Sequence, residues 1–445
     1  MTAPADTRTQ TSTASGCCDG AARPATDIRI GISLAAATSG ISHALREADA
    51  WPYLLPAWLA ATERSLAEAE PWHSVALRGA DAVLIPGFVF DGPGLVDADP
   101  RTYLGWEPRS GQAACCSVST GAGTQDLVEA LGTDMFFPAL VLGSPLGYRS
   151  DAVVVGEQNA ELTMALVDQL VEKAKADGIR SIVAPWVTDR PVNGPLLASL
   201  HNNGATVSFG GQENFLPLEH SSYEDYLASL TSRRRQRVKQ DEGKAVASGV
   251  RIARLDGEGL RPLTNRIAEL TIMNRQKYDG SESAEHISEL LTALVDDGAD
   301  VRAYVAYLND TVVASTVTIR QGKRLMLKWA GFDYAALGER SGLYFPLVLD
   351  RPLQDALAEG LESVETGPGA DEAKRLRGYQ PRSIYTAVWV ADVSAREQVA
   401  ALQGVYGGAR RAALATEAAA ADEPSAAARA LGRFRKKPAA DGCCG

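Results

Sequence analysis

Apolar and polar residues in the second half of the chain alternate with the period of a strand over three neighbouring runs. The runs are rich in β-branched residues, and the pairs Asn309 and Asp310, and Gly322 and Lys323, which separate them are typical of tight antiparallel turns. This pattern predicts a meander of three antiparallel strands, at 301–308, 311–320 and 324–332.

The patterns on both sides of the meander extend the order to β-α-α-β-β-β-α-β-α-β. Gly298 and Gly360 stand where helix-ending glycines are expected, while Pro346 and Pro352 argue against a regular helix over 341–360. The other expected elements are strands at 250–255, 361–366 and 382–391, helices at 260–279 and 283–298, and a short helix at 371–378.

The first half of the chain resembles a weaker copy of this arrangement. Leu162, Leu166, Leu170 and Ala174 mark one apolar face of a helix over 158–177. Strands are expected at 28–34, 74–78, 82–90, 135–142, 179–187 and 205–209, with a short helix capped by Asn193. The predicted fold class is α+β, with two domains that each have a mixed, mostly antiparallel sheet flanked by helices.

Length and composition suit two cores with polar ends. A chain of 445 residues with 45% hydrophobic content is too long for one ordinary core. We expect a disordered tail at 1–26, a first domain at 27–219, a catalytic second domain at 220–393, and a mobile Ala-rich, basic, Cys-terminated tail at 394–445. The long segment 91–133 predicts either a lid or a disordered insertion.

The charge balance limits the classes of partner. The chain has 44 Lys and Arg against 55 Asp and Glu, a net charge of -11, which argues against non-specific coating of nucleic acid or anionic membrane. The polar N-terminus and the absence of an apolar run of about 18 residues predict no membrane span and a cytoplasmic location.

The six cysteines form three adjacent pairs. Neighbouring thiols can share a soft metal ion or take part in redox chemistry, but none of the pairs has zinc-finger spacing, so incidental pairs in polar tails stay an equal alternative. The pairs are Cys17 and Cys18, Cys115 and Cys116, and the candidate metal ligands Cys443 and Cys444.

Two segments of the second half resemble a known group of proteins. The basic stretch 221–255 and the segment 367–382, with its Lys-x-x-x-Gly-Tyr pattern, are similar to those of tandem GNAT (acetyltransferase-fold) proteins, which include the Fem-type aminoacyltransferases and BioF-like acetyltransferase-domain proteins. The resemblance covers most of 50–393. It implies two GNAT-like domains side by side and transfer of an acyl or aminoacyl group, from acyl-CoA or aminoacyl-tRNA, to an amine.

Such a transfer needs an activated carbonyl, a neutral amine and donors for the oxyanion, and it needs no redox cofactor. In GNAT folds two neighbouring strands separate and leave backbone groups facing the cleft. The resemblance places this separation between the strands at 324–332 and 361–366.

The candidate catalytic residues come from the ends of these strands and from the helices beside them. Lys374 matches the lysine of the family pattern and would stabilise negative charge on the carbonyl. Tyr344 and Tyr385 are candidate general acids, and Glu365 and Asp333 are candidates to orient or deprotonate the amine. A solvated lysine, core-edge tyrosines and strand-end carboxylates remain the plainer interpretation of each.

Basic residues within 221–255 provide a candidate phosphate-binding surface, for tRNA, coenzyme A or a nucleotide-linked acceptor, although a charge run is often only a solvated helix face. The run comprises Arg233, Arg234, Arg235, Arg237 and Lys239. Further candidate substrate-binding residues are Lys328 and Trp329 in the third meander strand, and Arg377 and Gly378 after Lys374.

The segment 337–346 departs from the coenzyme A-binding loop of GNAT proteins. It keeps Gly338 and Gly342 but has Leu343 and Tyr344 where a small residue is needed, so both donors stay open. The favoured function is an acyl- or aminoacyltransferase acting on an amine of a small metabolite or cell-wall precursor. The alternative is a non-catalytic GNAT scaffold whose paired-cysteine tails bind a metal ion or a partner. The acceptor and the oligomeric state are left open.

Overall fold

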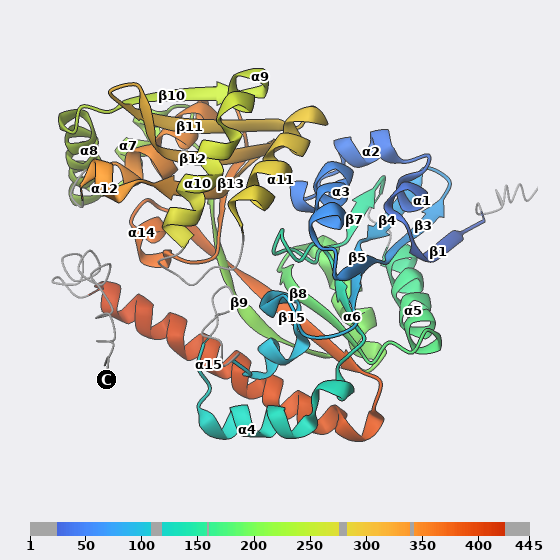
Figure 1. The fold of residues 1–445 in the computed structure, drawn as a ribbon. Coiled ribbons are helices and arrows are strands. Elements are labelled where there is room, and N and C mark those ends of the chain that lie inside the picture. The colour runs from blue at the N-terminus through green and yellow to red at the C-terminus, as the bar shows by residue number, and fades with distance from the viewer. Residues whose placement is uncertain (1–24, 108–117, 158–159, 276–282, 339–341, 423–445) are drawn as a thin grey trace, which may run out of the picture.

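One sheet of eleven strands runs through the whole molecule (Figure 1). The computed structural model describes residues 25–107, 118–157, 160–275, 283–338 and 342–422. The strand order is β10 (Arg251–Asp256), β11 (Asp300–Leu308), β12 (Thr311–Gln321), β13 (Arg324–Phe332), β14 (Ser363–Gly367), β9 (Thr206–Pro217), β15 (Gln380–Val390), β8 (Ser181–Thr188), β6 (Ala139–Leu142), β5 (Gly87–Phe90) and β2 (Ala69–Pro71).

The two halves of the chain exchange strands at the centre of this sheet. β9, from the first half, lies between β14 and β15, and β15, from the end of the second half, lies between β9 and β8. A short parallel pair flanks this centre on each side, β13 with β14 and β6 with β8, and all other neighbours are antiparallel. The fold is therefore mixed α and β, as predicted, but the two halves share one continuous sheet.

Helices cover both faces of the second half's sheet. On one face lie α9 (Gly257–Leu260), α10 (Thr264–Arg275) and α11 (Ala284–Asp296), and on the other α7 (Tyr223–Ser229), α8 (Ser232–Ala247) and α13 (Arg351–Ala358). The remaining short helices are α12 (Tyr334–Leu337) and α14 (Asp371–Arg375). The meander strands agree with the predicted ranges to within one residue.

The first half contains a second, four-stranded sheet of β1 (Asp27–Ile32), β3 (His73–Arg78), β4 (Asp81–Ile85) and β7 (Val153–Val155). The strand predicted at 82–90 is wrong, because it divides at Pro86 into β4 and β5, which belong to different sheets. Pro86 lacks the N–H that a continuous ladder requires, and its carbonyl accepts a hydrogen bond from Gly143 instead. The helices of this half are α1 (Leu34–Thr38), α2 (Ser42–Glu47), α3 (Pro56–Ser65), α4 (Ala122–Leu131), α5 (Ala160–Ala176) and α6 (Gly194–Asn202).

Two predicted helices of the second half begin later than expected. Pro262 lies in a 3-10 turn, so the regular helix α10 begins at Thr264 instead of 260. The helix expected from 341 begins at Tyr344 and widens into a π-helical turn over Pro346–Asp350 before α13. Prolines at both places remove backbone donors that a regular helix uses.

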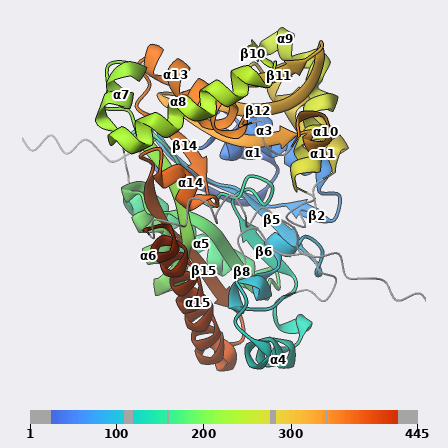
Figure 2. The same cartoon turned by 90° about the vertical axis from the view of Figure 1, so that its left-hand side faces the viewer.

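The mobile tail expected from residue 394 is wrong over Arg396–Asp422, which form the long helix α15 (Figures 1 and 2). Val399, Leu402 and Tyr406 are buried at helical spacing and join the core beneath β15. The side-chain amide of Gln403 donates to the Thr386 carbonyl at 2.8 Å. This face, with Ala-rich sequence on the other side, is enough to dock the helix.

The predicted lid or insertion at 91–133 is folded in its described parts, 91–107 and 118–133. Two 3-10 turns and α4 lie there, and the buried pair of Arg101 and Asp99 joins its guanidinium to its carboxylate at 2.6 Å. Cys115 and Cys116 lie outside the described residues.

We expect Leu402→Ala to lower the free energy of unfolding by about 2–4 kcal/mol, since it removes a buried side chain of α15 and leaves a cavity. Val405→Ala is the matched control on the same helix, because Val405 is 50% exposed and should change stability by less than about 0.5 kcal/mol. Urea denaturation monitored by circular dichroism measures both. Equal effects of the two variants would contradict the packing of α15.

Candidate functional site

The strands β13 and β14 separate after a short parallel contact. Only Arg324–Met326 pair with Ser363–Glu365, whereas β13 continues to Phe332 with β12 as its sole ladder partner. The separation expected between these two strands is therefore confirmed. Among the described residues, no strand pairs with this edge of β13 beyond Met326.

Lys328 lies where the two strands begin to separate. Trp329 pairs with Val317 and Leu327 with Thr318, so Lys328 is the extra residue of a β-bulge. Its Nζ donates to the Leu146 carbonyl at 3.1 Å. The strand irregularity thus directs a cationic side chain towards the first half of the chain.

Four aromatic rings surround this ammonium group, and we call them the aromatic box. Nζ lies 4.7 Å from the ring centroid of Tyr53, 5.0 Å from Trp58, 4.8 Å from Tyr148 and 5.8 Å from Trp329. These are cation–π distances. Burial raises the pKa of the Tyr53 phenol, so that ring stays neutral. The box holds a cation beside the strand gap.

The loop that supplies Tyr148 is tightly folded. Tyr148 has a φ of 53°, and Trp186, whose ring centroid lies 5.1 Å from that of Tyr148, has a φ of 54°. A Cβ on Gly143 would lie 2.0 Å from the Arg149 carbonyl, so only glycine fits at the start of the loop. Left-handed backbone at bulky residues costs about 1–3 kcal/mol and clusters at functional sites.

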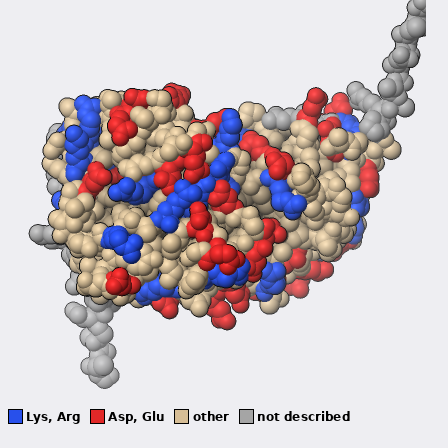
Figure 3. All heavy atoms as spheres, turned by 90° about the horizontal axis from the view of Figure 1, so that it is seen from above, with Lys and Arg blue, Asp and Glu red and all other residues tan. Residues whose placement is uncertain are grey.

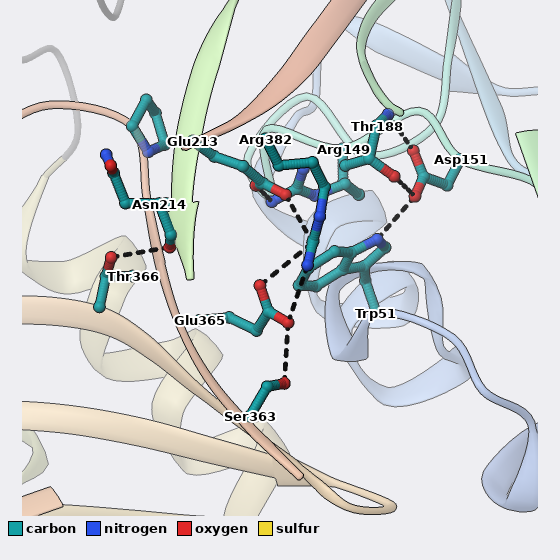
Figure 4. Close-up of polar contacts among 12 residues, drawn as sticks. Trp51, Arg149, Asp151, Thr188, Glu213, Asn214, Ser363, Glu365, Thr366 and Arg382 are labelled. Atoms are coloured by element: carbon teal, nitrogen blue, oxygen red, sulfur yellow. Dashed lines mark hydrogen bonds and ion pairs between the residues drawn. The ribbon is translucent and has the colours of Figure 1, made fainter. Parts of the chain in front are cut away.

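A chain of buried charges joins the two halves behind the box (Figure 4). Arg382 on β15 donates to Glu365 on β14 at 3.1 and 3.3 Å and to Glu213 on β9 at 3.0 Å. Glu213 also accepts from Arg149 at 2.7 Å. Burial disfavours the charge of Arg149, but Glu213 and Asp151 outweigh it and raise the pKa of the guanidinium.

Trp51 lies against Arg149, at one end of this chain of buried charges. Its Nε1 donates to Asp151 at 2.6 Å, and Asp151 also accepts from the Thr188 amide at 2.8 Å. The Arg149 guanidinium stacks 4.1 Å from the indole centroid. The charged side chains of this wall therefore link the two halves of the chain.

A family model described as FemAB-like, peptidoglycan biosynthesis/recognition, matches residues 125–423, which is more than half of the chain. The chain belongs to the FemAB-like family. The crystal structure titled FemX has a similar fold, with a TM-score of 0.51, 12% identity, and coverage of 84% of this chain and 100% of that one. No curated protein matches the sequence.

Two further solved structures are more weakly similar to this chain. A tandem GNAT protein from the clavulanic acid biosynthesis pathway has a TM-score of 0.44 at 12% identity and covers 82% of this chain and 99% of that one. A C-terminal domain of a putative lysylphosphatidylglycerol synthetase from Agrobacterium fabrum has a TM-score of 0.43 at 14% identity, with 59% and 81% covered.

The FemAB-like fold brings three of the predicted residues together. Glu365 is the last residue of β14 paired with β13, and Lys328 and Trp329 lie just beyond that point on β13. The Trp329 Nε1 is buried and has no hydrogen-bond partner among the described residues. A cation, a carboxylate and an unused donor thus lie within a few strand positions of the point where β13 and β14 separate.

Lys374, the first choice for catalysis, stabilises the turn after β14. Its Nζ donates to the carbonyls of Thr366, Gly367 and Pro368 at 3.0, 2.9 and 3.2 Å, and the residue is buried. A lysine that coordinates three main-chain oxygens orders the loop that borders the gap. Its role at the reacting carbonyl stays a prediction.

The remaining catalytic candidates lie elsewhere. Asp333 caps α12 through the Ala336 amide at 3.0 Å and pairs with Arg266 at 3.3 Å. Tyr344 packs its ring against Phe332, with centroids 5.8 Å apart. Tyr385 pairs with Val187 on β8, and strand alternation puts it on the sheet face opposite to Arg382. The structure thus does not bring these three to Glu365.

Arg377 belongs to a second buried network. It donates to Asp241 on α8 at 3.1 Å and to Asp350 in the π-helical turn at 3.3 Å. Gly378 follows with a φ of 84°, which explains the glycine of the family pattern. Burial raises the pKa of Asp350 to about 6, although Arg377 opposes this shift. The network attaches the Lys374 turn to α8.

Some basic residues of α8 contact other parts of the protein, and others are exposed to solvent. Arg235 donates to the carbonyls of Leu227, Ala228 and Leu230, and Arg237 pairs with Asp241 at 3.2 Å, whereas Arg233 is exposed. Arg234 is half-buried, and its amide is capped by the Thr231 hydroxyl. Basic and acidic side chains intermix on the face seen in Figure 3. Phosphate binding by α8 stays a prediction.

The described residues test part of the predictions on metal binding and on membrane spans. Among the described residues, no group of three or more His, Cys, Asp or Glu side chains could hold a metal ion, and no helix is long and apolar enough to cross a membrane. Cys443 and Cys444 lie outside the described residues. A hollow of about 690 Å³ between α3 and α11, lined by residues such as Ala57 and Asp296, contains none of the predicted site residues.

Sequence reasoning missed most of the network, in which Glu365 alone was a candidate site residue. Glu213 lies in β9 beyond the predicted strand end at 209, and Trp51 and Arg149 lie in segments read as connections. Arg382 closes the family segment but was not singled out. Glu213 gave no clear signal either, because it lies between Gln212 and Asn214, where a polar stretch is more readily read as exposed.

We expect Glu213→Gln to lower the free energy of unfolding by about 3–5 kcal/mol, since it leaves two buried guanidinium groups short of a counter-charge. Urea denaturation at pH 7 measures the change. Glu362→Gln is the matched control, because that carboxylate is exposed and pairs only with exposed Lys323. A loss below about 1 kcal/mol for Glu213→Gln would show that the network is not stabilising.

We also expect ionisation of the Asp350 carboxyl to lower the free energy of unfolding as pH rises. Its pKa of about 6 in the folded state exceeds the ordinary 3.8, so between these values the folded chain binds more protons than the unfolded one, and stability falls with rising pH. The stability difference between Asp350→Asn and wild type should shift in favour of the variant by about 2 kcal/mol from pH 4 to pH 7. Urea denaturation at several pH values tests this; parallel profiles would contradict it.

Proposed function

We propose that this FemAB-like chain transfers an aminoacyl or acyl group from an activated donor to the amine of a peptidoglycan-related acceptor. The observation that carries the proposal is the separation of β13 and β14 with Lys328 beside it. Membership of the FemAB-like family and the fold shared with FemX support the reaction class. In this proposal the gap receives the donor carbonyl.

The chemistry follows from the groups around the gap. The neutral acceptor amine attacks the carbonyl carbon and a C–N bond forms; the ester or thioester bond then breaks, and the proton lost by nitrogen passes to the leaving oxygen or sulfur, which departs as a hydroxyl or a thiol. Negative charge on the carbonyl oxygen is stabilised by backbone N–H groups on the open edge of β13 and by the Lys328 ammonium. Glu365 orients the N–H groups of the incoming amine.

We favour aminoacyl-tRNA over acyl-CoA as the donor. In the segment where GNAT proteins bind the pyrophosphate, Leu343 is fully buried, and a Cβ on Gly342 would lie 2.6 Å from the Cβ of Lys244. This packing leaves little room for a phosphate group at the start of the helix. Exposed basic residues of α8, such as Arg233, are the proposed contact for the phosphates of tRNA.

We expect Lys328→Met to lower kcat/KM for transfer by about 10²–10³-fold, because it removes the cation that faces the developing oxyanion. The assay combines purified protein with aminoacyl-tRNA or acyl-CoA and a peptide of the peptidoglycan type, and it measures deacylated tRNA or free thiol. Lys323→Met, at the exposed β12–β13 turn, is the matched control and should keep wild-type activity. Failure of the wild-type protein to turn over any donor would contradict the proposal.

A further inference from the structure

Four arginines from both halves of the chain converge on Trp51. Their guanidinium carbons lie 4.1 to 6.0 Å from the indole centroid, with Arg149 the nearest and Arg324 next at 5.0 Å. Trp51 is 1% exposed. The two other arginines are Arg190, after β8, and Arg382, on β15.

The carboxylates around these arginines neutralise their positive charge only when the exposed residue Asp49 is counted. Asp151, Glu213 and Glu365 are buried, whereas the Asp49 side chain is 74% exposed. Arg149 is buried and the other three arginines are partly buried, so four positive charges face three buried negative ones, which leaves a net charge of +1 until Asp49 is added. A buried excess of positive charge favours an anion.

Two guanidinium groups in this cluster also have unused donors. The Nε atoms of Arg149 and Arg324 are buried and have no hydrogen-bond partner among the described residues. Burial lowers the pKa of Arg324, and the neighbouring Arg190 lowers it further, so its charge is not fully compensated. The side of a guanidinium that carries Nε–H is well suited to hold two oxygens of a carboxylate or phosphate.

Asp49 occupies the outer part of the cluster. Its carboxylate contacts both Arg190 and Arg324. Its segment is held on the second half by Gln321, whose amide donates to the carbonyls of Arg46 and Ala48 at 2.7 and 3.2 Å. An ion pair with one partner this exposed contributes about 0–1 kcal/mol, so another anion can displace it.

We propose that the arginine cluster around Trp51 is an oxyanion-binding site, for a carboxylate or a phosphate group, and that Asp49 is its exchangeable internal ligand. The cluster reaches the strand gap through Arg382 and Glu365 (Figure 4). A ligand whose anionic group enters the cluster therefore extends towards the gap. That this ligand is the acceptor rests on the proposed function, whereas oxyanion binding itself does not.

Isothermal titration calorimetry at low salt tests the site without any turnover. Pyrophosphate and an N-acetylated dialanine with a free carboxylate serve as the two probes, and they distinguish a phosphate source from a carboxylate source. Asp49→Asn should tighten the Kd of at least one probe by about three- to fivefold, since it removes the competing carboxylate. Asp27→Asn, in an exposed pair with Arg29, is the matched control and should not change it.

A second variant tests whether binding of the probes depends on the arginine cluster or only on the net charge of the protein. Arg324→Gln in the Asp49→Asn background should weaken binding at least about tenfold, because it removes a charged donor. Thermal denaturation checks that this variant is folded. Equal affinity of wild type and Asp49→Asn for both probes, or an equal gain with Asp27→Asn, would overturn the site. Since no transfer is measured, this result would leave the proposed reaction standing, and loss of the reaction would leave the site standing.

Discussion

The pairing of β9 with β15 is the interaction on which the rest of the molecule depends. Each of these strands begins in one half of the chain and completes the sheet of the other, with residue pairs running from Gln380 and Phe215 to Val388 and Thr206. Because β14 pairs with β9 on the next edge, Glu365, Glu213 and Arg382 come from three adjacent strands. The charge network is thus a product of strand exchange, and neither half could form it alone.

The exchange of strands also explains how the desolvation cost of so many buried charges is offset. A buried ion pair offsets its desolvation only when most of its hydrogen-bonding capacity is used. Glu213 has two guanidinium partners, and Glu365 has one together with the Ser363 hydroxyl at 2.9 Å. The exceptions are the Nε atoms of Arg149 and Arg324, both beside Trp51. Buried donors without a partner are unusual, and these two lie at the site for which we propose an oxyanion ligand.

Local patterns could be predicted from the sequence, and long-range pairings could not. The meander of β11, β12 and β13 follows from alternation and turn residues, which act within a few positions of one another. Arg382 and Glu213 are 169 positions apart, and no periodicity connects them. The docking of α15 was missed for another reason: its alanine-rich sequence favours a helix but resembles a mobile tail, and the buried face formed by Leu402 and Tyr406 is recognisable only once β15 lies beneath it. The candidate site was therefore predicted in its second-half strands and missed in its first-half wall.

The sheets of the two halves are similar, but the spaces beside their parallel strand pairs differ. In the first half, β6 and β8 also pair in parallel over three residues, Ala139–Val141 with Ser181–Val183. There, however, the bulged residue Trp186 is 7% exposed, and its ring meets Tyr148 at 5.1 Å and Tyr103 at 5.9 Å. Aromatic rings occupy the region that corresponds to the gap beside Lys328. The first half instead supplies the rings and charges that face Lys328 and Glu365, so its part in the candidate site is to form the wall against which the gap of the second half opens.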